Sequence, residues 1–125
     1  MLQNLRRITI FAALAIPVAA CGPFHHAGPP DPIVLFNNQS VDQADVYAVG
    51  TGGDPVRIGT VFGGRRDSLH VRMSAVGGSG SVNIIARIFA SSRAPRTGSF
   101  ALGPGDIVEV TLSPDGKILS VLPAP

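Results

Sequence analysis

The sequence predicts an all-β fold, a small antiparallel β-sandwich of seven to eight short strands. From Ile33 onward, short runs rich in Val, Ile, Leu and Thr alternate with clusters of Gly, Pro, Asp and Ser, which is typical of strands joined by turns. The 125 residues include 15 Gly and 11 Pro, enough to supply many turns. No stretch has the i, i+3, i+4, i+7 spacing of an amphipathic helix, so we expect little or no helix.

Eight runs are predicted as strands, and several of them alternate apolar and polar residues with the period of two that a half-buried strand shows. In the fourth run, every second residue from Leu69 to Met73 falls on one apolar face. In the fifth run, every second residue from Val82 to Ile88 points inward. The predicted strands are 33–37, 45–49, 56–61, 68–73, 82–89, 99–102, 106–112 and 118–122.

The connections contain the residues that tight turns need, as in Thr51-Gly-Gly-Asp54, Gly63-Gly64 and Ser113-Pro-Asp-Gly-Lys117. In size and number of strands, residues 33–125 resemble an immunoglobulin-like sandwich. The resemblance implies architecture only, because the chain has one Cys and no Trp and so lacks the Cys–Trp–Cys hallmark of that family. The aromatic residues of the domain mostly fall within apolar runs, and most are expected in the core; they are Phe36, Tyr47, Phe62, Phe89 and Phe100.

Residues 1–20 have the organisation of an export signal. Arg6 and Arg7 give a basic start, and the apolar run 8–20 follows them. This run is shorter than the roughly 20 residues that a membrane-spanning helix needs, and its length suits a signal peptide.

The run ends in Val18-Ala19-Ala20-Cys21, which resembles the lipobox of bacterial lipoprotein precursors. The resemblance implies that the signal peptide, 1–20, is cleaved and that Cys21, the only cysteine, receives the lipid. Residues 21–32 are then a lipidated Cys with a Pro- and Gly-rich, extended tether. Gly22, where many inner-membrane lipoproteins have Asp, favours the outer membrane, facing the periplasm, in a Gram-negative cell. The alternative is an ordinary secretory signal followed by a chance Cys.

Composition argues against several functions. The chain has ten Lys and Arg and eight Asp and Glu, and two of the basic residues lie in the predicted signal peptide. The mature chain therefore has equal numbers of basic and acidic residues, and no nucleic-acid partner is expected. We expect no enzyme, no cofactor and no metal site. His25 and His26 lie in the tether and His70 on the polar face of a strand. Asp42 and Asp45 alone supply too few oxygen ligands for calcium, which takes six to eight. They are better explained as a pair that stabilises a turn.

The predicted function is binding of a protein or glycan partner at the cell envelope. If strands alternate in direction, the connections after the first, third, fifth and seventh strands share the end farther from the tether, and only acidic residues are expected at the opposite end. The residues predicted to bind an acidic partner there are Arg65, Arg66, Arg93, Arg96 and Lys117. One alternative is a structural subunit that joins an envelope assembly through a sheet edge, for which the uncharged run 118–122 qualifies. Another is a small-ligand or metal carrier.

Overall fold

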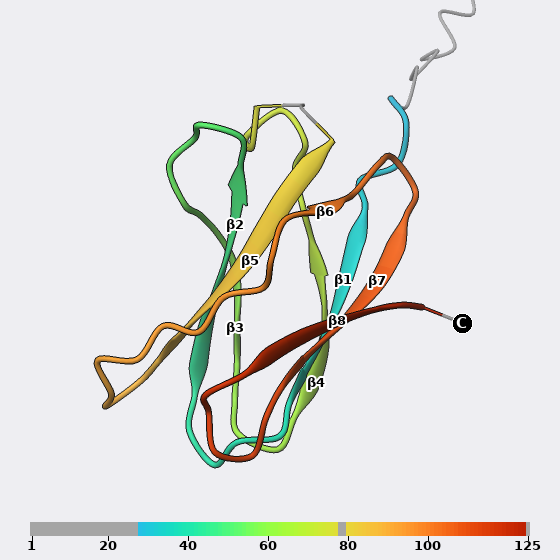
Figure 1. Ribbon diagram of the computed structural model, residues 1–125. Helices are drawn as coiled ribbons and strands as arrows, with labels where there is room; N and C mark the ends of the chain where they lie inside the picture. The colour runs from blue at the N-terminus through green and yellow to red at the C-terminus, as the bar shows by residue number, and fades with distance from the viewer. Residues whose placement is uncertain (1–27, 78–79, 125) are drawn as a thin grey trace, which may run out of the picture.

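The computed structural model describes residues 28–77 and 80–124, and these form two β-sheets packed face to face (Figure 1). The predicted all-β sandwich is confirmed, with eight strands and no helix in the described ranges. The predicted signal peptide, Cys21 and the first part of the predicted tether lie outside those ranges. The strands are β1 (Ile33–Asn38), β2 (Ala44–Gly50), β3 (Val56–Val61), β4 (Arg66–His70), β5 (Ser81–Ile88), β6 (Phe100–Ala101), β7 (Ile107–Leu112) and β8 (Leu119–Pro123).

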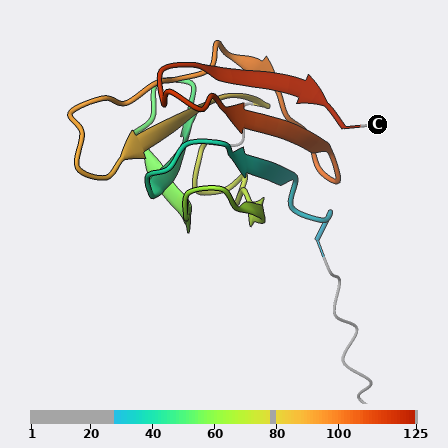
Figure 2. The same ribbon diagram turned by 90° about the horizontal axis from the view of Figure 1, so that it is seen from below.

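Sheet A has the strand order β4-β1-β7-β8, and sheet B has the order β3-β2-β5-β6; Figure 2 shows the two layers from below. All neighbouring strands are antiparallel except β1 and β7, which are parallel. The prediction of a purely antiparallel sandwich is therefore wrong at this pair. Strand direction alternates along the chain, so two odd-numbered strands run the same way when they become neighbours. The strand order also differs from that of immunoglobulin domains, so the resemblance is one of architecture.

The core lies between the two sheets, and the alternation in the sequence predicts most of it. In β5, every second residue from Val82 to Ile88 is buried, as expected. In β7, Val108, Val110 and Leu112 are buried in the same way. The buried side chains of both sheets form one apolar cluster, and burial of this apolar area is the main force that holds the layers together.

The fourth strand differs from its prediction at both ends, because it runs from Arg66 to His70 instead of 68–73. After His70, the backbone N–H of Val71 donates a hydrogen bond to the carbonyl of Pro32, and a turn closes from Ala75 N–H to the Arg72 carbonyl. Arg72 and Met73 therefore belong to a connection.

Two of the five aromatic residues of the domain are exposed, although most of the five were expected in the core. Phe62 is 63% exposed and Phe89 is 67% exposed, whereas Phe36 is fully buried. Phe89 follows Ile88, which points inward, so the alternation of β5 turns Phe89 outward. Tyr47 and Phe100 are half-buried. The core is thus built mainly from aliphatic side chains.

The alternating strand directions divide the connections between two ends of the sandwich. We call one the far end; it comprises the connections 39–43, 62–65 and 113–118 and the first part, 89–93, of the connection 89–99. Hydrogen bonds hold three of them together there, since the N–H of Gly64 donates to the Ser40 carbonyl and the N–H of Gln39 to the carbonyl of Leu112, the residue just before 113–118. The predicted distribution is therefore confirmed for these three connections, which lie together in the lower part of Figure 1, whereas only the start of 89–99 is at this end.

The opposite end, which we call the tether end, holds residues 28–32 and the connections after β2, β4 and β6. The last part of the predicted tether is fixed to the domain here. The carbonyl of Pro30 accepts a hydrogen bond from the N–H of Gly105, and Pro32 is buried. The chain that leads back to Cys21 therefore leaves the sandwich at this end.

Candidate partner-binding end of the sandwich

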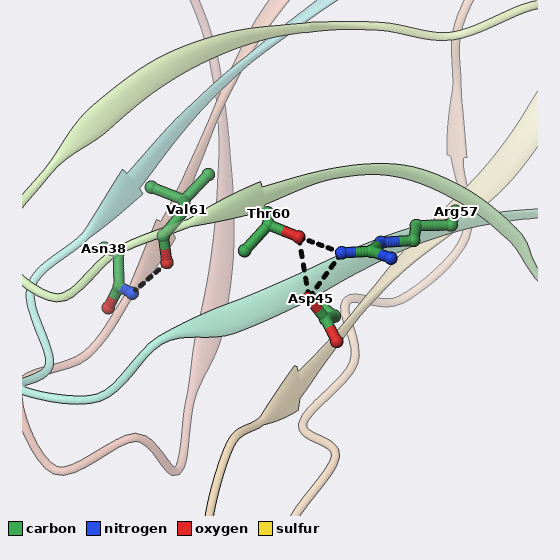
Figure 3. Close-up of polar contacts among 5 residues, drawn as sticks. All are labelled: Asn38, Asp45, Arg57, Thr60 and Val61. Atoms are coloured by element: carbon green, nitrogen blue, oxygen red, sulfur yellow. Dashed lines mark hydrogen bonds and ion pairs between the residues drawn. The ribbon is translucent and has the colours of Figure 1, made fainter.

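The far end is built around Asn38, the last residue of β1, whose side chain is completely buried. Its amide nitrogen donates hydrogen bonds to the carbonyls of Asp42 at 2.8 Å and Val61 at 3.0 Å (Figure 3 shows the bond to Val61). Its side-chain oxygen accepts hydrogen bonds from the N–H and the hydroxyl of Ser40. One buried amide thus joins the β1–β2 connection to the end of β3.

A pair of glycines brings the β3–β4 connection against the β1–β2 connection. A Cβ on Gly63 would lie 2.4 Å from the carbonyl oxygen of Val41, and that distance is too short for any other residue. Gly64 has a φ of 72°, and its N–H donates to the carbonyls of Asn38 and Ser40. The two residues that flank this glycine pair, Phe62 and Arg65, are consequently held at the surface of the far end.

Exposed apolar side chains gather at this end. Six large hydrophobic side chains are exposed among the described residues, and four of the six lie on the far-end connections, one on each. Those four are Val41 (90% exposed), Phe62 (63%), Phe89 (67%) and Ile118 (62%). Single exposed apolar residues are normal, but here every connection at this end carries one.

Phe89 is placed by a strained turn. Ala90 has a φ of 63°, the left-handed region that residues with a Cβ rarely adopt, and the N–H of Ser91 closes the turn on the carbonyl of Ile88. The N–H of Phe89 donates a 2.8 Å hydrogen bond to the carbonyl of Gln43 in the β1–β2 connection. This bond holds the start of the β5–β6 connection against the β1–β2 connection.

Four of the five predicted basic residues lie at the far end, namely Arg65, Arg66, Arg93 and Lys117. Arg66 is neutralised, because its guanidinium forms a 2.6 Å ion pair with Glu109 on the outer face of sheet A. The other three form no ion pair with any residue in 28–77 or 80–124.

Acidic residues reduce the positive field at the far end. Asp42, Asp67 and Asp115 lie on or beside the same connections. Hydrogen bonds from the Ser113 hydroxyl and the Lys117 N–H hold the pKa of Asp115 below its usual value, so this carboxylate is charged at neutral pH. The end therefore combines apolar side chains with a modest basic charge.

Arg96 does not lie at the far end, contrary to the prediction. Residues 93–97 run back along β5, where Arg96 pairs with Ile85 halfway along the strand. It lies instead beside a hollow of about 250 Å³ on the outer face of sheet B. There, the Arg87 guanidinium lies 5.4 Å from the ring centre of Tyr47. The sequence did not indicate this second basic site, because nothing in it showed that the 89–99 connection folds back.

The tether end is not purely acidic, again contrary to expectation, because the early end of β4 leaves Arg72 in that region. Asp42 and Asp45 also do not act as a pair. Asp45 forms a 3.0 Å ion pair with Arg57 and accepts a hydrogen bond from Thr60, and both partners lie on β3 (Figure 3). In the parts of the chain that the structure describes, no three His, Cys, Asp or Glu side chains are grouped as metal ligands would be, and His70 is exposed.

No protein-family model matches this chain, and the search of curated proteins finds no significant match. Within the described ranges there is no helix of the length and apolar character needed to cross a membrane.

Proposed function

We propose that the chain is a lipid-anchored, non-catalytic module of the bacterial cell envelope, and that its far end binds a partner protein with an acidic and partly apolar surface. The observation that carries the proposal is the set of four exposed apolar side chains, one on each far-end connection. Aromatic and Arg side chains are enriched at protein interfaces, and both kinds are present there in Phe62, Phe89, Arg65 and Arg93.

A protein partner is favoured over a glycan because the far end has more exposed apolar side chains than excess basic charge. The basic excess at the far end is small, so charge alone gives little affinity for an anionic polysaccharide, and at physiological salt its field is screened within about 8 Å. Burial of apolar area, in contrast, is not weakened by salt in this way. The partner is therefore expected to cover Phe62 and Phe89 and to place acidic groups near Arg65, Arg93 and Lys117.

The anchor in this proposal is the lipid on Cys21, supported by the lipobox resemblance of Val18-Ala19-Ala20-Cys21. The described chain begins at the tether end, and strands of five to eight residues, at about 3.3 Å each, separate that end from the far end by roughly 20 Å. The attachment point thus leaves the binding surface uncovered. Residue Gly22 favours the outer membrane, facing the periplasm, if the cell is Gram-negative.

The test is a charge reversal at the far end, made in the anchored protein in its own envelope. The triple variant Arg65→Glu, Arg93→Glu and Lys117→Glu is expected to lose most of the partner that the wild-type protein retains after mild cross-linking. All three side chains are exposed and lack ion pairs to the described residues, so the unfolding midpoint should change little.

The matched control reverses three other exposed arginines, Arg72 at the tether end and Arg87 and Arg96 on the outer face of sheet B. This variant carries the same change in net charge and should retain the partner. Equal retention by both triple variants, or loss in both, would contradict the assignment of binding to the far end.

A further inference from the structure

The edge strand β8 lacks the charged residues or short length that protect the other three sheet edges, and its one proline, Pro123, is its last residue. It pairs with β7 on one side and ends sheet A on the other. No residue from 118 to 124 is charged. The opposite edge of sheet A, β4, contains Arg66 and Asp67, β3 contains Arg57, and β6 is only two residues long. Charges and short length are the usual means of preventing edge-to-edge pairing.

The backbone groups on the free side of β8 follow from its pairing with β7. The carbonyl of Ile118 accepts a hydrogen bond from Ser113 N–H, and the N–H of Ala124 donates to the Ile107 carbonyl. The even-numbered residues along β8 therefore direct their backbone N–H and C=O groups toward β7. Because the direction of backbone groups alternates along an antiparallel strand, Leu119 and Val121 direct their N–H and C=O groups outward.

The side chains on the outer face of this edge are two apolar residues on either side of a small polar one. Ile118 is 62% exposed and Leu122 is 59% exposed, with the exposed Ser120 between them. This arrangement is symmetric about Ser120, so a reversed copy of the same strand would match it.

We propose that β8 pairs antiparallel with β8 of a second copy of this chain, with the two-fold axis at Ser120. Each Ile118 then lies opposite Leu122 of the other copy, and Leu119 and Val121 exchange backbone hydrogen bonds across the axis. The two A sheets become one continuous sheet of eight strands with an isologous interface, which is the commonest form of protein dimer.

The register centred on Ser120 is favoured because the neighbouring registers lose a backbone hydrogen bond or separate the exposed apolar side chains. With the axis at Val121, Leu119 would face Pro123, which has no N–H to donate. With the axis at Leu119, Leu122 would face Gly116, and Ile118 would face Ser120. Only the register centred on Ser120 brings the two exposed apolar residues together, and it places Pro123 opposite Lys117, which lies in the turn before β8.

The pairing is carried by the β8 edge and the proposed binding function by the far end, and the one residue that the two surfaces share is Ile118. The two-fold axis reverses the second copy, so the two far ends lie at opposite poles of the dimer, where Val41, Phe62 and Phe89 stay uncovered. Loss of partner binding in the far-end variant would leave the dimer intact, and loss of the dimer would leave the far end intact.

The test is site-specific disulfide formation in the full chain with Cys21→Ser, in which any introduced cysteine is the only thiol. Ser120→Cys is expected to form a covalent dimer under mild oxidation, because residues on the two-fold axis face each other. Ser68→Cys is the matched control, an exposed serine on the opposite edge strand of the same sheet, and it should stay monomeric. Cross-linking of the Ser120→Cys chain no greater than that of the control would overturn the proposal.

Two further results establish the register and the role of the edge. Ile118→Cys and Leu122→Cys chains should cross-link when mixed but not separately, and self-linking of either chain would contradict the axis at Ser120. In sedimentation at high concentration, Ser120→Lys should be monomeric because it places two positive charges on the axis, whereas Ser68→Lys should sediment like the wild-type dimer. A wild-type monomer under these conditions would also overturn the proposal.

Discussion

Replacement of Ile84 with alanine is expected to lower the free energy of unfolding by about 2–5 kcal/mol, a large share of the 5–15 kcal/mol that a typical domain has. Ile84 is 0% exposed at the centre of β5, and its neighbours on β2 and β5, Ala48 and Ala86, are too small to fill the space that its side chain leaves. Its backbone is fixed on both sides, because β2 pairs with one edge and the buried Thr97 bonds to the other. The site therefore has little freedom to collapse.

The midpoint of urea unfolding measures this effect, provided that the slope of the transition is unchanged. Ile85→Ala is the matched control, since Ile85 has the same side chain on the outer face of the same strand and is only half-buried. Its effect should be less than half as large. A loss smaller than about 1 kcal/mol for Ile84→Ala would show that this residue does not lie in a close-packed core.

Replacement of Asn38 with alanine is expected to destabilise the fold by about 2–4 kcal/mol. The substitution removes both donors that bond the carbonyls of Asp42 and Val61 and the acceptor for Ser40, all at a buried position. Each buried polar group that loses its partner costs about 1–3 kcal/mol, although water can reach part of this site after the change. Because the three groups belong to the far end, we also expect its connections to loosen before the rest of the sandwich unfolds.

Urea unfolding again gives the size of the effect, and hydrogen exchange at the Gly64 amide, which bonds to the Asn38 and Ser40 carbonyls, reports on the far end. The control is Asn37→Ala, an amide on the outer face of the same strand that makes no side-chain hydrogen bond to the described residues. It should change stability by about 0.5 kcal/mol or less. Equal effects of the two substitutions would contradict the structural role of Asn38.

The sequence predicts the layers of this fold well because burial follows the period of two in β5 and β7. It could not predict that β1 and β7 are parallel neighbours, since no local pattern specifies which strands of a sandwich meet. Asn38 carried a signal that sequence reasoning missed. It continues the inward series Val34, Phe36, Asn38, and a polar residue at an inward position must find hydrogen bonds.

The candidate site was predicted only in part. Alternating strand direction correctly brings Arg65, Arg93 and Lys117 to one end, but Arg96 lies elsewhere because 93–97 folds back along β5. The apolar half of the site was missed because Phe62 and Phe89 belong to apolar runs. At the end of a strand, only the alternation of side chains between the two faces distinguishes a core residue from an exposed one.

The central claim, that this is a lipid-anchored module, is tested most directly by metabolic labelling with a fatty-acid analogue. The wild-type chain should incorporate the label and fractionate with membranes, whereas Cys21→Ser should do neither, because Cys21 is the only thiol that can be acylated. Each buried methylene contributes about 0.8 kcal/mol to membrane partition, so loss of the acyl chains should release the domain. Wild-type protein that carries no label would contradict the claim.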